Sequence, residues 1–250
     1  MSEQEIIEGR NPVLEALRAR RRVYRIWLQP DARGVAVREI RRLAAEDGIP
    51  VEEMDGRTMA QRSKTGHPQG VMAQVEAWRY ATVDAILARA GATPPFLLVL
   101  DGIQDPQNFG SLLRTAETAG VHGVIIPEHR AVGLTPAVAR AAAGATEYIP
   151  VARVTNLVRT MEELKRQGIW FVGADPTGMD YWQSPVDWCG PVGLVVGGEG
   201  KGISRLVREH CDALLRLPML GRISSLNASV AGGILMYEAV RWRLNPAARN

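Results

Sequence analysis

From Phe96 onward, short apolar runs alternate with helix-like stretches, and this alternation constrains the fold more than any other feature. The runs expected to form strands are Phe96–Leu100, Gly123–Ile126, Tyr148–Val151, Trp170–Val172, Val192–Val196 and Leu214–Leu217. Helical patterns lie between them at about 110–119, 136–143, 156–167 and 203–210, and a long one follows at about 227–244. Continuously apolar strands are typical of parallel sheets covered by helices on both faces. The sequence therefore predicts an α/β fold.

The first 76 residues carry a smaller α/β pattern of their own. Strands are expected at Val23–Leu28, Ile49–Met54 and Val71–Val75, with an amphipathic helix at Val35–Asp47. Residues 77–95 contain one short helical pattern and end in Gly-Ala-Thr-Pro-Pro, a composition typical of connectors. We therefore predict a small domain over residues 1–76, a linker over 77–95 and a larger domain over 96–250.

Composition narrows the class of protein. Hydrophobic residues make up 46% and charged residues 23%, which is ordinary for a globular protein. No apolar run approaches the ~18 residues that would span a bilayer, and the first ten residues are too acidic for a signal peptide. The two cysteines, Cys189 and Cys211, lack the spacing of a metal site. We expect a cytoplasmic protein with no membrane segment, disulfide framework or metal.

The basic residues are nearly all arginine. Only Lys64, Lys165 and Lys201 are lysines among 30 basic residues, and guanidinium groups suit bidentate contact with phosphate. A biased genome composition would explain the excess equally well. Arg18, Arg20, Arg21, Arg22 and Arg25 fall within eight residues without an acidic neighbour. This cluster is the best candidate in the chain for nucleic-acid phosphates, although most charge runs are simply solvated surface.

Three unusual loops follow strands of the larger domain, where ligands of open parallel sheets bind. The first runs from Asp101 to Gly110 and leads into a helix that carries Arg114. It could be an ordinary loop with Asn108 as helix cap and Arg114 on the surface. The third, residues 217–231, presents Ser225 and Asn227 at the start of the last helix, where Ser225 could likewise be only a cap.

The second loop has four glycines among residues 197–202, which permit close approach of a ligand or another backbone. It is not a phosphate-binding P-loop, because Gly202 rather than Ser or Thr follows Lys201 and because Glu199 would repel phosphate. An acidic, glycine-rich loop fits a cofactor that is not a phosphate ester.

Together the three loops resemble the three motifs of the SpoU (TrmH-type) RNA 2′-O-ribose methyltransferases, in order and spacing. Asp-x-Pro-x-Asn-x-Gly-x-x-x-Arg-(Ser/Thr)-Ala matches residues 105–116. Gly-x-Glu-Gly-x-Gly matches 197–202, and Pro-Met-x-Gly-x-x-x-Ser-Leu-Asn-x-Ser-Val-Ala matches 218–231. Residues 8–13 and 66–71 also resemble the ends of the substrate-binding domain of the RlmB-like subgroup, which modifies a guanosine of 23S rRNA.

The resemblance implies a SPOUT-type domain with a C-terminal trefoil knot, S-adenosyl-L-methionine (AdoMet) as cofactor and a homodimer. By motif position, cofactor contacts would come from Gly197, Gly198, Leu217, Met219 and Leu226. The catalytic residues would be Asn108, Arg114, Glu199, Ser225 and Asn227. The family mechanism makes the residue at Arg114 a proton acceptor. Because a guanidinium keeps its proton, we favour stabilisation of the developing alkoxide instead.

RNA is the expected partner, bound through Arg18, Arg20, Arg21, Arg22 and His67. One alternative substrate is a guanosine of transfer RNA, but that branch of the family typically lacks the small domain. A second alternative is a non-catalytic RNA-binding protein. A nicotinamide oxidoreductase fits least, because no Gly-x-Gly-x-x-Gly follows the first strand of the larger domain.

Overall fold

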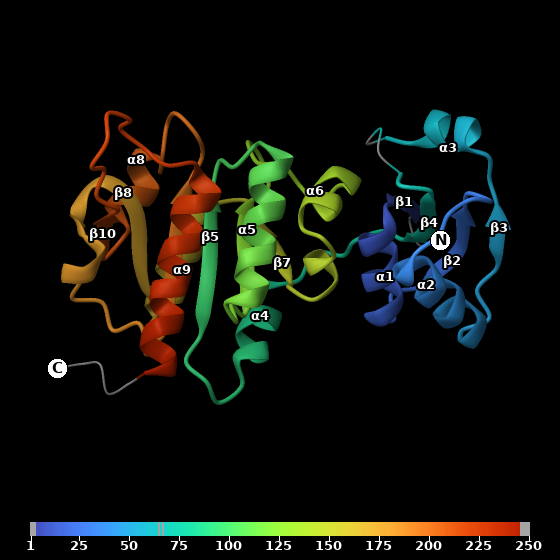
Figure 1. Ribbon diagram of the computed structural model, residues 1–250. Helices are drawn as coiled ribbons and strands as arrows, with labels where there is room; N and C mark the ends of the chain where they lie inside the picture. Colours follow the sequence, from blue (N-terminus) through green and yellow to red (C-terminus); the bar gives the residue numbers. More distant parts are fainter. Residues whose placement is uncertain (1–3, 65, 67, 246–250) are drawn as a thin grey trace. The chain divides into compact units, whose positions relative to one another are not determined.

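The computed structural model describes residues 4–64, 66 and 68–245, which form two compact units (Figure 1). The first unit takes the chain up to Arg79 together with residues 133–148, and the second unit takes residues 80–132 and the chain from Ile149 onward. Contacts thus group residues 133–148 with the N-terminal part, whereas the sequence division assigned them to the larger domain. The predicted division into a small domain ending at residue 76, a linker ending at residue 95 and a larger domain stays a prediction.

The first unit is built on a four-stranded sheet in the order β1-β4-β2-β3, with β1 and β2 antiparallel to β4. Its elements are β1 (Gln4–Glu8), α1 (Arg10–Arg18), β2 (Val23–Leu28), α2 (Val35–Glu46), β3 (Val51–Glu53), α3 (Gly56–Arg62), β4 (Val71–Glu76), α6 (Pro136–Ala141) and the short η1 (Ala145–Glu147). Ile7, Ile26 and Ile40 lie in one core cluster of sheet and helix residues. Helix α3 was not predicted.

The second unit contains a six-stranded sheet in the order β10-β8-β9-β5-β6-β7, and every neighbouring pair is parallel. The strands are β5 (Phe96–Asp101), β6 (Gly123–Pro127), β7 (Val151–Val154), β8 (Trp170–Asp180), β9 (Val192–Gly197) and β10 (Ala213–Arg216). The whole of β9 is buried, as its unbroken apolar run indicates. The predicted α/β fold with a parallel sheet is confirmed.

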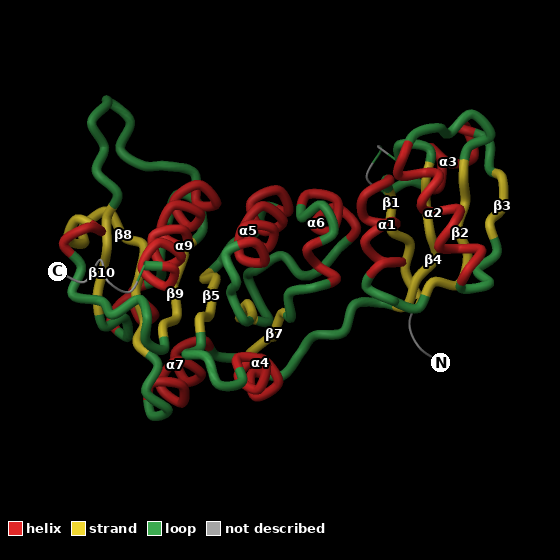
Figure 2. Tube along the Cα trace, turned by 60° about the horizontal axis from the view of Figure 1, so that its bottom comes forward, coloured by secondary structure: helices red, strands yellow, loops and turns green. Residues whose placement is uncertain are grey.

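Helices cover both faces of this sheet (Figure 2). Helices α5 (Pro106–Thr118) and α9 (Ala228–Leu244) lie side by side on one face, and α4 (Val83–Ala90) and α7 (Leu157–Lys165) lie on the other. The short α8 (Arg205–Glu209) and η2 (Tyr181–Gln183) complete the unit. A Cβ at Gly232 of α9 would stand 2.7 Å from Leu112 of α5, so the small residue permits this close packing.

Two further observations concern the chain as a whole. Strand β7 begins three residues later than predicted, because Tyr148 belongs to the first unit, where its hydroxyl donates to Glu15 at 2.6 Å.

Within the described residues, no helix is both long and apolar enough to cross a bilayer. The C-terminal knot stays a prediction.

Candidate active site

The order of the strands brings two of the three loops together. From β5 the chain adds β6 and β7 on one side of the sheet, and β9 later pairs with the other side of β5. The last residues of the two strands, Asp101 and Gly197, are register partners. The loops that follow β5 and β9 therefore start next to each other, at the point in an open parallel sheet where ligands bind.

The loop after β9 folds tightly because its glycines have no side chains. A Cβ at Gly197 would stand 2.1 Å from the carbonyl carbon of Gly202, and one at Gly198 would stand 2.4 Å from the carbonyl oxygen of Gly102. Gly200 and Gly202 adopt the left-handed φ values of 78° and 63°, which favour glycine. The loop thus packs against the loop after β5 and presents mainly backbone to its surroundings.

Three polar side chains, one from each loop, form a closed hydrogen-bonded triangle. The Asn108 amide donates to Glu199 Oε1 at 2.9 Å, and the Asn227 amide donates to the same oxygen and to Asn108 Oδ1, each at 2.8 Å. A carboxylate only accepts hydrogen bonds, which fixes both amide nitrogens toward Glu199. The Asn227 oxygen in turn accepts from the Ser229 backbone N–H at 2.9 Å and so caps α9.

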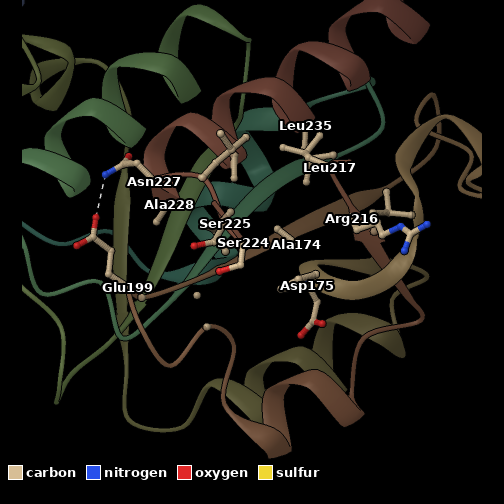
Figure 3. A pocket seen from close by; sticks show the side chains of 18 of the residues that line it. Ala174, Asp175, Glu199, Arg216, Leu217, Ser224, Ser225, Asn227, Ala228 and Leu235 are labelled. Carbon is tan, nitrogen blue, oxygen red and sulfur yellow. Dashed lines mark hydrogen bonds between the residues drawn. The ribbon is translucent and has the colours of Figure 1, made fainter. Parts of the chain in front are cut away.

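A cavity of about 420 Å³ opens beside this triangle, at the middle of β8 and the ends of β9 and β10 (Figure 3). Its lining includes all five predicted cofactor residues, Gly197, Gly198, Leu217, Met219 and Leu226. Of the predicted catalytic residues, Glu199, Ser225 and Asn227 also line it. Asn108 is 7% exposed and reaches the rim through its hydrogen bonds.

Arg114 does not line this cavity. Its side chain is exposed on α5 and has no hydrogen bond or ion pair with any residue that the structure describes. The first loop therefore brings Asn108 to the rim of the cavity, while Arg114 of the following helix lies outside the cavity lining.

Asp175 is a lining residue that sequence reasoning missed. Pairing between β8 and β10 jumps from Gly173 to Met179, so the intervening residues leave the ladder, and Ala174, Asp175 and Pro176 line the cavity. The Asp175 carboxylate accepts from the Thr177 backbone N–H at 2.8 Å and lies 3.4 Å from Arg208 Nε. The segment Gly-Ala-Asp-Pro-Thr directly after the apolar β8 run was the available signal.

The cavity suits a cation with an apolar body. Val196, Leu215, Leu217 and Leu235 provide apolar walls. Glu199 provides a carboxylate without an ion pair among the described residues, whereas Asp175 is paired with Arg208, and Arg216 of the lining is paired with Asp180. No basic cradle for a phosphate is built into the glycine loop. AdoMet, which combines a flat adenine with a positively charged sulfur, fits this set of residues.

The predicted RNA-binding arginines differ in their surroundings. Arg18 is half exposed and pairs with Glu15 at 2.9 Å, and Arg20 and Arg22 are exposed. Arg21 is instead enclosed: its side chain is 10% exposed, donates to Glu5 and to Glu147, and stacks over Trp78 at 4.3 Å. Its guanidinium is occupied inside the first unit. His67 lies outside the described residues.

Burial dominates the electrostatics of the cluster around Arg21. It raises the pKa of the Glu5 and Glu147 carboxyls, and the neighbouring Arg21 charge only partly offsets the rise. Trp78 contributes its backbone N–H to Glu5 at 3.0 Å and its ring N–H to Glu147 at 3.3 Å. The cluster therefore ties residues 133–148 to the N-terminal part of the chain.

Comparison with known proteins agrees with these observations. The SpoU rRNA methylase family model matches residues 95–237, and a model for RNA 2′-O ribose methyltransferase substrate binding matches residues 6–81. The 23S rRNA (guanosine-2′-O-)-methyltransferase RlmB of Pseudomonas syringae pv. tomato is 44% identical over 248 residues, covering 97% of this chain and 98% of that protein.

Solved structures give the same picture. The SpoU methyltransferase AviRb from Streptomyces viridochromogenes, crystallised with AdoMet, matches 96% of this chain and 91% of its own at a TM-score of 0.80 and 27% identity. The A. aeolicus TrmH/SpoU tRNA modifying enzyme matches only 61% of this chain and 77% of its own, at a TM-score of 0.55 and 28% identity. The protein belongs to the SpoU rRNA methylase family.

Proposed function

We propose that this protein transfers a methyl group from AdoMet to the ribose 2′-hydroxyl of a guanosine in 23S rRNA. The proposal rests on one observation: three loops meet at the rim of a single cavity, which has apolar walls and the Glu199 carboxylate. Hydrogen bonds among Asn108, Glu199 and Asn227 join the three loops. The AdoMet-bound AviRb structure and the RlmB relatives support the reaction and the cofactor.

A ribose hydroxyl is a poor nucleophile, since it is almost fully protonated near neutral pH. AdoMet supplies a methyl group on a positively charged sulfur that is already a good leaving group. The protein must therefore align the hydroxyl and assist loss of its proton. The Glu199–Asn108–Asn227 triangle holds the loops rigidly for alignment, and the Ser225 hydroxyl lines the same cavity.

Arg114 is proposed to stabilise the negative charge that develops on the ribose oxygen. A guanidinium has a pKa above about 12 and five donors, so it acts as a fixed cation rather than as a base. Its side chain is free of ion pairs with described residues and so is available to a substrate.

Ribosomal RNA is favoured over transfer RNA by the extent of the matches. The RlmB relative matches this chain almost throughout, and the substrate-binding model takes residues 6–81. The A. aeolicus tRNA modifying enzyme covers only 61% of the chain. We assign RNA recognition to residues 1–76, a connecting role to 77–95, and methyl transfer to 96–250, with a C-terminal knot as the resemblance implies.

A homodimer and a cytoplasmic location complete the proposal. Val230, Ile234 and Tyr237 of α9 are 39–51% exposed apolar or aromatic side chains on one helix, a feature that suits an interface between copies. The Tyr237 hydroxyl lies 3.4 Å from Thr118 Oγ1 of α5, one turn from Arg114. Pairing on this face would place Arg114 near the interface.

The direct test is to map 2′-O-methylated positions in total RNA from strains with and without the gene. We expect one guanosine of 23S rRNA to lose its methyl group in the deletion strain. The purified protein should restore it in the presence of AdoMet. Loss of a transfer-RNA methyl group with unchanged ribosomal RNA would refute the substrate assignment, and no change in either RNA would refute the activity.

A further inference from the structure

A second pocket lies in the first unit, at one edge of its sheet. Strands β1 and β2 end there and β4 begins there, because both are antiparallel to β4. The pocket is lined by the residues that follow or precede these three neighbouring strands, namely Arg10, Gln29, Asp31, Ala32, Pro68, Gln69 and Gly70. Neither the three catalytic motifs nor the Arg18–Arg25 cluster contributes to it.

A hydrogen bond joins two residues of the pocket lining, and a buried carboxylate lies outside the lining, at the end of β1. The Glu8 side chain at the end of β1 is 1% exposed and accepts from Ser63 Oγ at 2.5 Å and from the Lys64 N–H at 2.7 Å. Arg10 Nε donates to the Gln69 carbonyl at 3.2 Å. Gln69 adopts a φ of 52°, an uncommon value for a residue with a side chain.

Gln29 is enclosed but keeps its side-chain amide unused. A Cβ at Gly56 would stand 2.5 Å from its amide nitrogen, and one at Gly70 would stand 2.8 Å from its amide oxygen. The amide has no hydrogen bond to any residue within 4–64, 66 and 68–245, and the exposed Asp31 carboxylate has no ion pair there. Gln29 and Asp31 thus line the pocket, and neither side chain has a hydrogen-bond or ion-pair partner among the described residues.

We propose that this pocket holds a single unpaired nucleobase of the RNA substrate. The inference rests on the proposed function for the presence of RNA. Amide and carboxylate groups together match the mixed donors and acceptors of a base edge, and proteins read RNA sequence mainly through unstacked bases. A phosphate would contact Arg10 but would also be repelled by Asp31, whereas a base edge has donors and acceptors for both groups. Gln29 and Asp31 read the base, and Arg10 and Gln69 frame it.

This assignment separates two kinds of contact in the first unit. Exposed arginines such as Arg20 and Arg22 would meet phosphates, whose binding releases counterions and weakens with salt. A base held by Gln29 and Asp31 contributes affinity with no counterion release. Loss of a base contact should therefore lower the affinity at every salt concentration and leave the salt dependence unchanged.

The test compares Asp31→Asn, Gln29→Met and their double variant with the matched control Asp47→Asn, an exposed aspartate at the end of α2 outside the pocket. The probe is large-subunit ribosomal RNA from a strain lacking the gene, titrated with the full-length protein from about 50 to 200 mM salt. We expect the pocket variants to bind roughly 5- to 150-fold more weakly, with the wild-type slope of log affinity against log salt and wild-type AdoMet binding.

Asp31 is exposed, so Asp31→Asn should fold normally, and a thermal melt checks this. Binding by the double variant that equals the Asp47→Asn control, or a shallower salt slope, would overturn the base pocket. A wild-type protein that binds this RNA through Asp31 but methylates none of it would instead refute the proposed function and leave the pocket standing.

Discussion

Replacement of Gly197 by alanine should disable the cofactor site without unfolding the protein. The added methyl group would stand 2.1 Å from the Gly202 carbonyl carbon and 2.2 Å from the Ile203 backbone nitrogen. Both neighbours are backbone atoms, so no flexible side chain can turn away. Ordinary contact begins near 3.4 Å, and the loop after β9 must therefore move by about 1.3 Å.

The size of the effect follows from what that movement breaks. Gly202 donates to the Gly198 carbonyl at 2.9 Å, and the Ser204 N–H donates to Asp101 at 2.7 Å. Overpacking of this kind costs about 1–3 kcal/mol. Because the displaced backbone lines the cavity, most of this cost should appear in binding. AdoMet affinity should fall about 5- to 150-fold.

Isothermal titration of AdoMet into Gly197→Ala and wild-type protein measures the effect directly. The matched control is Gly221→Ala, since a Cβ at Gly221 meets no atom within 4 Å and its φ is not left-handed. The control should bind AdoMet within about twofold of wild type. Wild-type AdoMet affinity in Gly197→Ala would show that the close backbone approach of Gly197 to Gly202 is not required for AdoMet binding, and would refute the reasoning.

Four further outcomes are expected. Light scattering should give twice the 27.3 kDa chain mass, and Ile234→Asp on the exposed face of α9 should return the monomer; a monomeric wild type contradicts the dimer. Arg114→Ala should abolish methyl transfer but keep AdoMet affinity, and appreciable turnover would remove Arg114 from the mechanism. Arg20→Ala with Arg22→Ala should make the salt slope of RNA binding shallower by about 0.7–0.9 per lost phosphate contact, and an unchanged slope would exclude such contacts. The pKa values of Glu5 and Glu147 are raised, so the folded protein holds their protons more tightly than the unfolded chain; their contribution to stability is greatest at low pH and is lost as pH rises through the raised values. Glu147→Gln should flatten that trend in urea unfolding, and an unaltered trend would contradict the assignment.

Periodicity was enough to predict most of the second unit. The buried run at Val192–Val196 became β9, and the long pattern at 227–244 became α9. Short elements that depend on a few local hydrogen bonds could not be predicted from periodicity. Helix α3 begins because Asp55 accepts from the Arg57 and Thr58 N–H groups, each at 3.0 Å, and its seven residues are too few to show a period.

The residues of the site also fall into those that the sequence predicted and those that it did not. Residues that line the cavity through their position at a strand end or helix start, such as Leu217 and Asn227, could be placed from the motifs. Asp175 stands in the segment Gly-Ala-Asp-Pro-Thr after an apolar run, but its place in the cavity depends on a jump in strand register that this segment alone does not specify. Arg21 is indistinguishable in sequence from Arg20 and Arg22, and its burial depends on partners distant in the chain, namely Glu5, Trp78 and Glu147.

The ion pair between Arg21 and Glu147 spans 126 residues and constrains when the first unit can be finished. A ribosome adds about 5–20 residues per second, so roughly 6–25 s separate the synthesis of the two partners. During that interval Arg21 and Glu5 lack the carboxylate that completes their cluster. The N-terminal sheet can form early, but this unit is complete only after residues 80–132 of the second unit have been made. The first unit therefore gains its last segment only after synthesis of the second unit has begun.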